Sequence, residues 1–252
     1  KSLPFYELGG EGGSGKSTLI RNLWRMFGRE ATEGIDPNSA RPAGLRRAME
    51  QTSNLPFVLI ESDYEDSKKN VRNEFSFDSL KKLYDHRGVM ATLCVAKRGS
   101  DTEQPPFLNA LFFSQNAPVK ATRPTLERIV RMATFVAKPE TEPAVIALNK
   151  IPTQDIAGYL TTVIKAEKAY LELYHKAFEK YRLRLWDVGI KQSPIRLITN
   201  HAQTLAAVEC LTLFFPQMNQ QLLDATEQYV IKLMRDRELI ITGDNATITN
   251  FW

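Results

Sequence analysis

The chain has 252 residues, of which 43% are hydrophobic, and this length suits one sizeable core with a small appended domain. Lys and Arg number 33 against 29 acidic residues, so the net charge is +4. This mild excess is compatible with a polyanionic partner without defining one. No apolar stretch approaches the roughly 18 residues of a membrane span, and no signal peptide is recognisable. With neither feature in the sequence, we expect a cytoplasmic protein.

The cysteines and the two ends of the chain add further expectations. Cys94 and Cys210 are far apart in apolar settings, which is typical of buried thiols in a reducing compartment. The chain starts at Lys1 and stops within the apolar run Asn250–Trp252. We therefore expect it to be a fragment of a longer polypeptide.

The first part of the chain alternates strand and helix patterns. Residues 3–8 predict a strand that runs into a glycine-rich loop, and apolar residues at helical spacing predict a helix over 16–28. A second helix is expected near 43–51. The continuous apolar run 57–60 predicts a strand that is buried on both faces.

Two further apolar runs, 89–97 and 107–114, flank a polar tip, so they predict a hairpin that leads toward a core strand. The later part of the chain predicts helices over residues 154–183, 201–214 and 219–241. The sequence therefore predicts an α/β core over 1–150, followed by an all-helical region over 151–252.

One motif carries specific chemistry. The run from Gly10 to Ser17 fits G-x-x-x-x-G-K-[ST] at every fixed position, between a predicted strand and a predicted helix. Backbone N–H groups of such a loop wrap phosphates, Lys16 reaches the β- and γ-phosphates, and Ser17 ligates Mg²⁺. The alternative is a chance glycine-rich turn. The expected nucleotide-binding residues are Gly10, Gly12, Gly13, Ser14, Gly15, Lys16, Ser17 and Thr18.

Acidic side chains follow the second predicted strand. A P-loop enzyme needs a carboxylate at the end of a neighbouring strand to hold Mg²⁺ and polarise water, and Glu61 and Asp63 follow the run 57–60. Ser62 separates them, which departs from the usual adjacent pair. We expect Glu61 on the metal side with Asp63 as its helper, although the two roles are interchangeable. The alternative is a pair of acids at a solvated strand end.

The next predicted strand ends in the amide Asn116. An Asn at a strand end is by itself typical of a turn. Here it follows Lys97 and Arg98, then the Pro105–Pro106 pair and an apolar strand. The order of P-loop, acidic strand end, basic tip and Asn116 resembles motifs A, B, B′ and C of superfamily 3 helicases, a branch of the AAA+ ring ATPases.

The segment 198–203 and the ending 250–252 look like a narrower family, the toprim-containing primase–helicase proteins of bacterial integrative and conjugative elements. No toprim acids are present in the sequence, so a primase part or partner is expected outside this chain. The resemblance implies an AAA+-like P-loop NTPase fold and an ATP- and Mg²⁺-dependent helicase for the replication of a mobile element. It also implies a homo-oligomer, as a hexameric ring, acting on single-stranded or forked DNA.

The resemblance also implies roles for individual residues. Asn116 would contact the γ-phosphate and orient the attacking water, and Lys97 or Arg98 would grip DNA phosphates in a central channel. Arg128, in the segment Leu126–Ile129, is similar to an arginine finger that reaches the neighbouring subunit's site. Such a guanidinium contributes about 10³–10⁵ in rate. The alternative for Lys97, Arg98 and Arg128 is that each is an ordinary surface charge without a role in DNA binding or catalysis.

Other function classes remain open. A regulatory or defence NTPase switch would keep the P-loop and the acids without unwinding DNA. A P-loop kinase would act as a monomer with catalytic arginines in a lid, and the arrangement from Pro105 to Asn116 disfavours it. The absence of an LSGGQ-like signature disfavours an ABC-type ATPase. No convincing guanine-reading segment is present, because the residues after Asn149-Lys150 lack the required Asp.

Overall fold

The computed structural model describes most of the chain. The described residues are 2–30, 34–60, 75–87, 92–93, 102–103, 106–136, 138–189 and 194–242.

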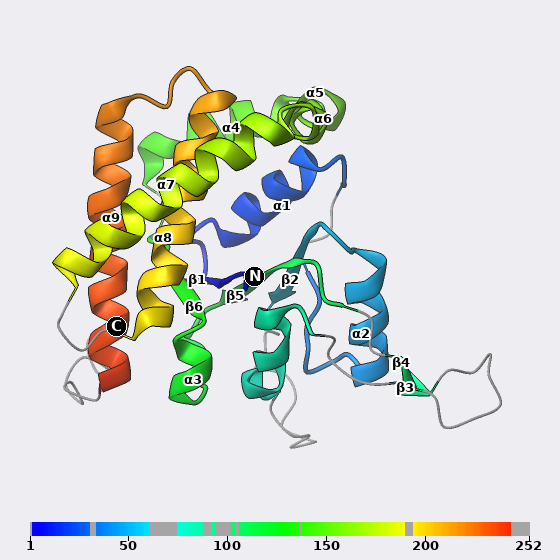
Figure 1. Cartoon of the computed structure of the whole chain (residues 1–252). Helices are drawn as coiled ribbons and strands as arrows, with labels where there is room; N and C mark the ends of the chain where they lie inside the picture. The colour runs from blue at the N-terminus through cyan, green and yellow to red at the C-terminus, as the bar shows by residue number, and fades with distance from the viewer. Residues whose placement is uncertain are drawn as a thin grey trace.

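A four-stranded parallel sheet forms the centre of the fold (Figure 1). Its strands, in spatial order, are β2 (Pro56–Ile60), β5 (Ala110–Gln115), β1 (Phe5–Gly9) and β6 (Ile129–Ala133). All pairings are parallel, so the carboxyl ends of the strands share one edge of the sheet. The fold is therefore α/β, as the sequence predicts.

Helices cover both faces of the sheet, which explains why its strands are apolar along their length. Helix α1 (Lys16–Met26) covers one face, where Ile20 and Trp24 pack with Leu8 and Val58. Helix α2 (Pro42–Gln51) and the 3₁₀ segment η2 (Phe77–Asp85) cover the other. The buried side chains on that second face include Phe5, Leu45, Met49, Leu59, Leu80, Leu83 and Phe113.

Only part of the predicted hairpin lies among the described residues. The two short strands β3 (Thr92–Leu93) and β4 (Thr102–Glu103) pair in antiparallel fashion ahead of β5. The tip that carries Lys97 and Arg98 lies outside the described residues.

All regular elements among the described residues after β6 are helices, joined by short turns and loops. These elements are η3 (Pro139–Thr141), α4 (Glu142–Lys150), α5 (Thr153–Ile156), α6 (Gly158–Lys165), α7 (Glu167–Val188), α8 (Ile195–Cys210), η4 (Leu211–Leu213) and α9 (Gln220–Thr242).

The prediction of one long helix over 154–183 was wrong, because the chain forms three helices there. The breaks lie at Ala157 and Ala166. Gly158 and the β-branched run 161–164 both have weak helix propensity, which accounts for an interruption in this stretch. The prediction of a single helix followed from the many strong helix formers in α7.

Helices α7, α8 and α9 form a second core beyond the β6 edge of the sheet (Figure 1). The fully buried Leu185, Leu197 and Met234, one from each helix, belong to it. Polar contacts join α8 to the sheet layer: Tyr84 donates to Asn200 Oδ1 at 2.7 Å, and Asn200 Nδ2 donates to the Glu127 carbonyl at 2.9 Å. The helical region is thus attached to the sheet by buried side chains.

Every helix in the part of the chain that the structure describes is too short or too polar to cross a bilayer.

Candidate nucleotide-binding site

The loop between β1 and α1 has the backbone that phosphate binding requires. Gly15 precedes α1 with φ 84°, in the left-handed region that glycine adopts without strain. The loop opens directly onto the amino end of α1, an 11-residue helix whose first N–H groups and dipole favour an anion. The predicted strand, loop and helix therefore occur in the expected order.

The side chain of Lys16 folds back over this loop. Its ammonium donates to the Gly10 carbonyl, to the Glu11 carbonyl at 2.9 Å and to Ser14 Oγ at 3.3 Å. The residue is only 8% exposed. Because the same ammonium is the expected ligand of the β- and γ-phosphates, nucleotide binding would exchange these loop carbonyls for phosphate oxygens.

Thr134, the residue that follows strand β6, makes hydrogen-bond contacts with both ends of the loop. Its N–H donates to the Gly9 carbonyl at 2.7 Å, and its hydroxyl lies 2.9 Å from Ser14 Oγ. A Cβ on Gly10 would come within 2.3 Å of the Thr134 hydroxyl and 2.4 Å of its carbonyl oxygen. Thr134 therefore approaches Gly10 too closely for any residue with a Cβ to fit at this position. Sequence reasoning missed Thr134, because it missed β6; the apolar run 129–133 was the available signal.

Asn116 lies beside the P-loop. It follows β5 directly, and β5 pairs with β1 so that Gly9 lies opposite Gln115. The Gly10 N–H donates to the Gln115 carbonyl at 3.2 Å, which ties the two strand ends together. The topology thus brings the exposed Asn116 next to the predicted phosphate site.

Glu61 and Asp63, the predicted acids, follow a strand that is not the direct neighbour of the P-loop strand β1. We expected them on a strand neighbouring the P-loop strand, but β5 lies between β1 and β2. With neighbouring strands about 4.8 Å apart, the end of β2 lies roughly 10 Å from β1. Glu61 and Asp63 follow β2 and lie outside the described residues. Their strand nonetheless ends at the same edge of the sheet as the P-loop.

Of the three expected Mg²⁺ ligands, Ser17 lies among the described residues. Ser17 is exposed at the second position of α1, on the same edge of the sheet as the end of β2. A hydroxyl and carboxylates are hard oxygen donors, which Mg²⁺ prefers together with phosphate oxygens. Ser17 with Glu61 or Asp63 would hold the ion.

Arg128 lies at the amino ends of the strands, whereas the P-loop lies at their carboxyl ends. Its carbonyl accepts from the Phe5 N–H at 2.9 Å, at the start of β1, so five strand residues separate it from the P-loop. Its guanidinium lies 5.1 Å from the centre of the Tyr84 ring and donates to the Pro124 carbonyl. Burial, reinforced by the charge of Arg196, lowers the pKa of Arg128. Arg128 is therefore not part of the site in its own chain.

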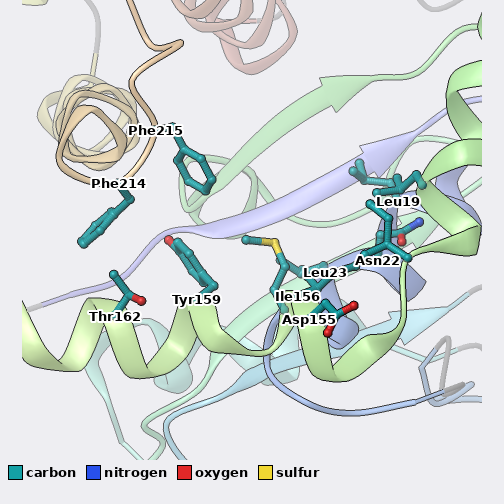
Figure 2. Close-up of a pocket in the computed structure, with 12 residues that line it drawn as sticks. Leu19, Asn22, Leu23, Asp155, Ile156, Tyr159, Thr162, Phe214 and Phe215 are labelled. Atoms are coloured by element: carbon teal, nitrogen blue, oxygen red, sulfur yellow. The ribbon is translucent and has the colours of Figure 1, made fainter.

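An apolar cleft with a volume of 520 Å³ is lined by residues of α1 on one side and of the helical region on the other (Figure 2). Tyr159 of α6 stacks on Phe215, with ring centres 5.9 Å apart and an interplanar angle of 21°. The cleft is lined by Leu19, Asn22, Leu23, Met26, Asp155, Ile156, Tyr159, Phe214 and Phe215, among others. An aromatic wall with a few polar groups is typical of small-molecule sites of this size.

The fold is similar to that of the active helicase Cch of SCCmec type IV, which matches with a TM-score of 0.64 and 13% identity over 98% of this chain and 46% of that one. The JCV helicase in complex with a thiazolopyridine compound also aligns over 98% of this chain and 53% of that one at 14% identity, but its TM-score of 0.31 is too low to show a shared fold. This chain thus spans about half the length of each.

No protein-family model and no curated protein matches the sequence. The similarity to Cch identifies the architecture as a helicase-like α/β fold with added C-terminal helices.

Proposed function

We propose that this protein is an ATP-driven DNA helicase or translocase that works as a ring-shaped homo-oligomer. The observation that carries the proposal is the juxtaposition of a complete P-loop with Asn116 on the adjoining strand end, within a fold similar to that of the helicase Cch. A phosphate-binding loop alone would fit many NTPases. A polar amide held next to it supplies a group that can orient a water molecule at the γ-phosphate.

The chain's own residues divide the work of hydrolysis. The loop N–H groups and Lys16 would bind the phosphates, and Ser17 with Glu61 or Asp63 would hold the metal. The carboxylate that is not a ligand polarises the attacking water, which Asn116 orients. Mg²⁺ supplies neutralisation of the charge that develops on the phosphate oxygens.

The cleft along α1 is suited to the nucleobase. Leu19 lies one turn beyond Lys16, about 4.5 Å along the helix axis, so the cleft opens within reach of a nucleoside whose phosphates occupy the loop. Stacking of a base on an aromatic ring is worth about 1–3 kcal/mol. Tyr159→Ala is therefore expected to weaken ATP binding about tenfold and to leave inorganic triphosphate binding unchanged. Equal loss for both ligands would place the base elsewhere.

The position of Arg128 suits action on a neighbouring subunit. In a ring built by a head-to-tail interface, a group acting in trans lies on the face away from its own nucleotide site. Arg128→Ala subunits mixed with Lys16→Ala subunits should then recover part of the ATPase activity, because some interfaces combine an intact loop with an intact Arg128. A fully active Arg128→Ala monomer would contradict the ring.

The basic tip provides the test of DNA translocation. Contacts with phosphates tolerate any DNA sequence, and they make affinity depend on salt. The logarithm of the DNA-binding constant falls by about 0.7–0.9 for each phosphate contact per unit increase in the logarithm of the salt concentration. Replacing Lys97 and Arg98 by Ala should lower the salt slope of DNA affinity by about one unit for each lost contact and abolish DNA-stimulated hydrolysis, while basal hydrolysis persists. Wild-type ATPase that DNA does not stimulate would instead support a nucleotide switch.

A further inference from the structure

A charged residue lies at the centre of the strand that leads into the P-loop. Glu7 is fully buried in β1, and its two carboxylate oxygens have separate partners. Oε2 accepts from Arg237 Nη2 of α9 at 2.9 Å, and this arginine is itself only 3% exposed. Oε1 accepts from the Val119 N–H at 3.0 Å and lies 3.3 Å from Arg131 Nε. One carboxylate therefore connects β1 with α9, β6 and the segment after β5.

The contact with Val119 concerns the candidate water-orienting residue. Asn116 stands between two backbone anchors: the Gln115 carbonyl accepts from Gly10, and the Val119 N–H donates to Glu7. The partners of these two groups, Gly10 and Glu7, belong to the loop after β1 and to β1 itself. The position of Asn116 relative to the P-loop is thus set from both sides by the same strand.

A stabilising ion pair is not by itself a sufficient reason for a carboxylate at this place. Replacing a buried ion pair by apolar side chains of similar volume is often neutral or stabilising. An apolar residue, however, offers no acceptor for the Val119 N–H. The distinctive contribution of Glu7 is a directed acceptor next to the segment that carries Asn116.

We propose that Glu7 is a positioning residue that holds Asn116 in register with the P-loop, with Arg237 of α9 fixing the orientation of its carboxylate. The inference rests on the proposed ATP hydrolysis and adds to it a residue outside the loop, together with a helix of the C-terminal region. Glu7 touches neither nucleotide nor metal in this assignment, and it acts only through the Asn116 segment.

Two double variants separate positioning from packing. Glu7→Gln with Arg237→Met removes the ion pair but keeps an oxygen that accepts from Val119. Glu7→Leu with Arg237→Met removes both. A control is Glu227→Leu with Arg184→Met, because Arg184, whose side chain is about half exposed, contacts the buried Glu227 between α7 and α9, away from the P-loop.

Steady-state ATPase kinetics give the readout, with melting curves to show that each variant is folded at the assay temperature. The Gln double variant and the control should keep kcat within about twofold of wild type. The Leu double variant should lose about tenfold or more in kcat with KM for ATP within about twofold, because small displacements of a reacting group cost large factors in rate. In an Asn116→Ala background that loss should disappear.

Wild-type kcat in the Leu double variant, or an equal loss with and without Asn116, would overturn the inference. Should the Leu double variant not fold, Val119→Pro makes the same comparison, since proline lacks the N–H donor. A wild-type protein that binds but does not hydrolyse ATP would instead refute the proposed function, and the role of Glu7 would fall with it.

Discussion

Arg237→Met tests how strongly the buried pair joins α9 to the sheet. The substitution leaves the Glu7 carboxylate with 0% exposure and without its closest cation, which lies 2.9 Å away. Removing one partner of a buried ion pair costs about 3–5 kcal/mol. In a chain of this length each kcal/mol lowers Tm by roughly 2–4 °C, so we expect a decrease of about 6–20 °C.

Denaturant unfolding followed by circular dichroism measures this loss. Glu7→Gln with Arg237→Met is the matched control, since it removes the orphaned charge as well, and we expect it to recover most of the lost stability. A single variant that costs less than about 1 kcal/mol, or a double variant as unstable as the single one, would refute the reasoning. The first result would mean that water or Arg131 compensates the Glu7 charge, and the second that the loss comes from the packing of Arg237 and not from the unpaired charge.

Three further substitutions test individual contacts. Gly10→Ala forces a Cβ into Thr134, so nucleotide affinity should fall at least tenfold with little change in circular dichroism; a fluorescent ATP analogue measures it. Asn116→Ala should keep Kd for ATP within about twofold but reduce kcat about 10²-fold, the cost typical of losing one group that acts at the transition state; unchanged kcat would remove Asn116 from the site. Tyr84→Phe takes the donor from the buried Asn200 Oδ1 and should cost about 1–3 kcal/mol in denaturant unfolding.

The elements that local patterns specify could be predicted from the sequence. The strand, glycine-rich loop and helix of the predicted P-loop are present, and the helix predicted over 16–28 is α1. The apolar run 57–60 is strand β2, buried on both faces because α1 and α2 cover opposite sides of the sheet. These signals lie within a few residues of one another, so no knowledge of the tertiary fold was needed.

The arrangement of strands could not be predicted, because it depends on contacts between distant segments. Nothing near the strand that ends at Ile60 indicates that β5 separates it from the P-loop strand. Strand β6 was missed because its short apolar run is interrupted by Arg131, whose guanidinium lies beside the buried Glu7. The support of the P-loop by Thr134 follows from that strand, so it was missed too.

ATP hydrolysis by the purified protein, measured with and without single-stranded DNA, tests the central claim most directly. The Lys16→Ala variant serves as the control: the Lys16 ammonium donates to the Gly10 and Glu11 carbonyls and to Ser14 Oγ of the loop, so its loss should leave the melting curve unchanged. The account predicts Mg²⁺-dependent hydrolysis that DNA stimulates and that Lys16→Ala abolishes. Hydrolysis that persists near the wild-type rate in Lys16→Ala, with an unchanged melting curve, would contradict the assignment of this loop as the nucleotide site.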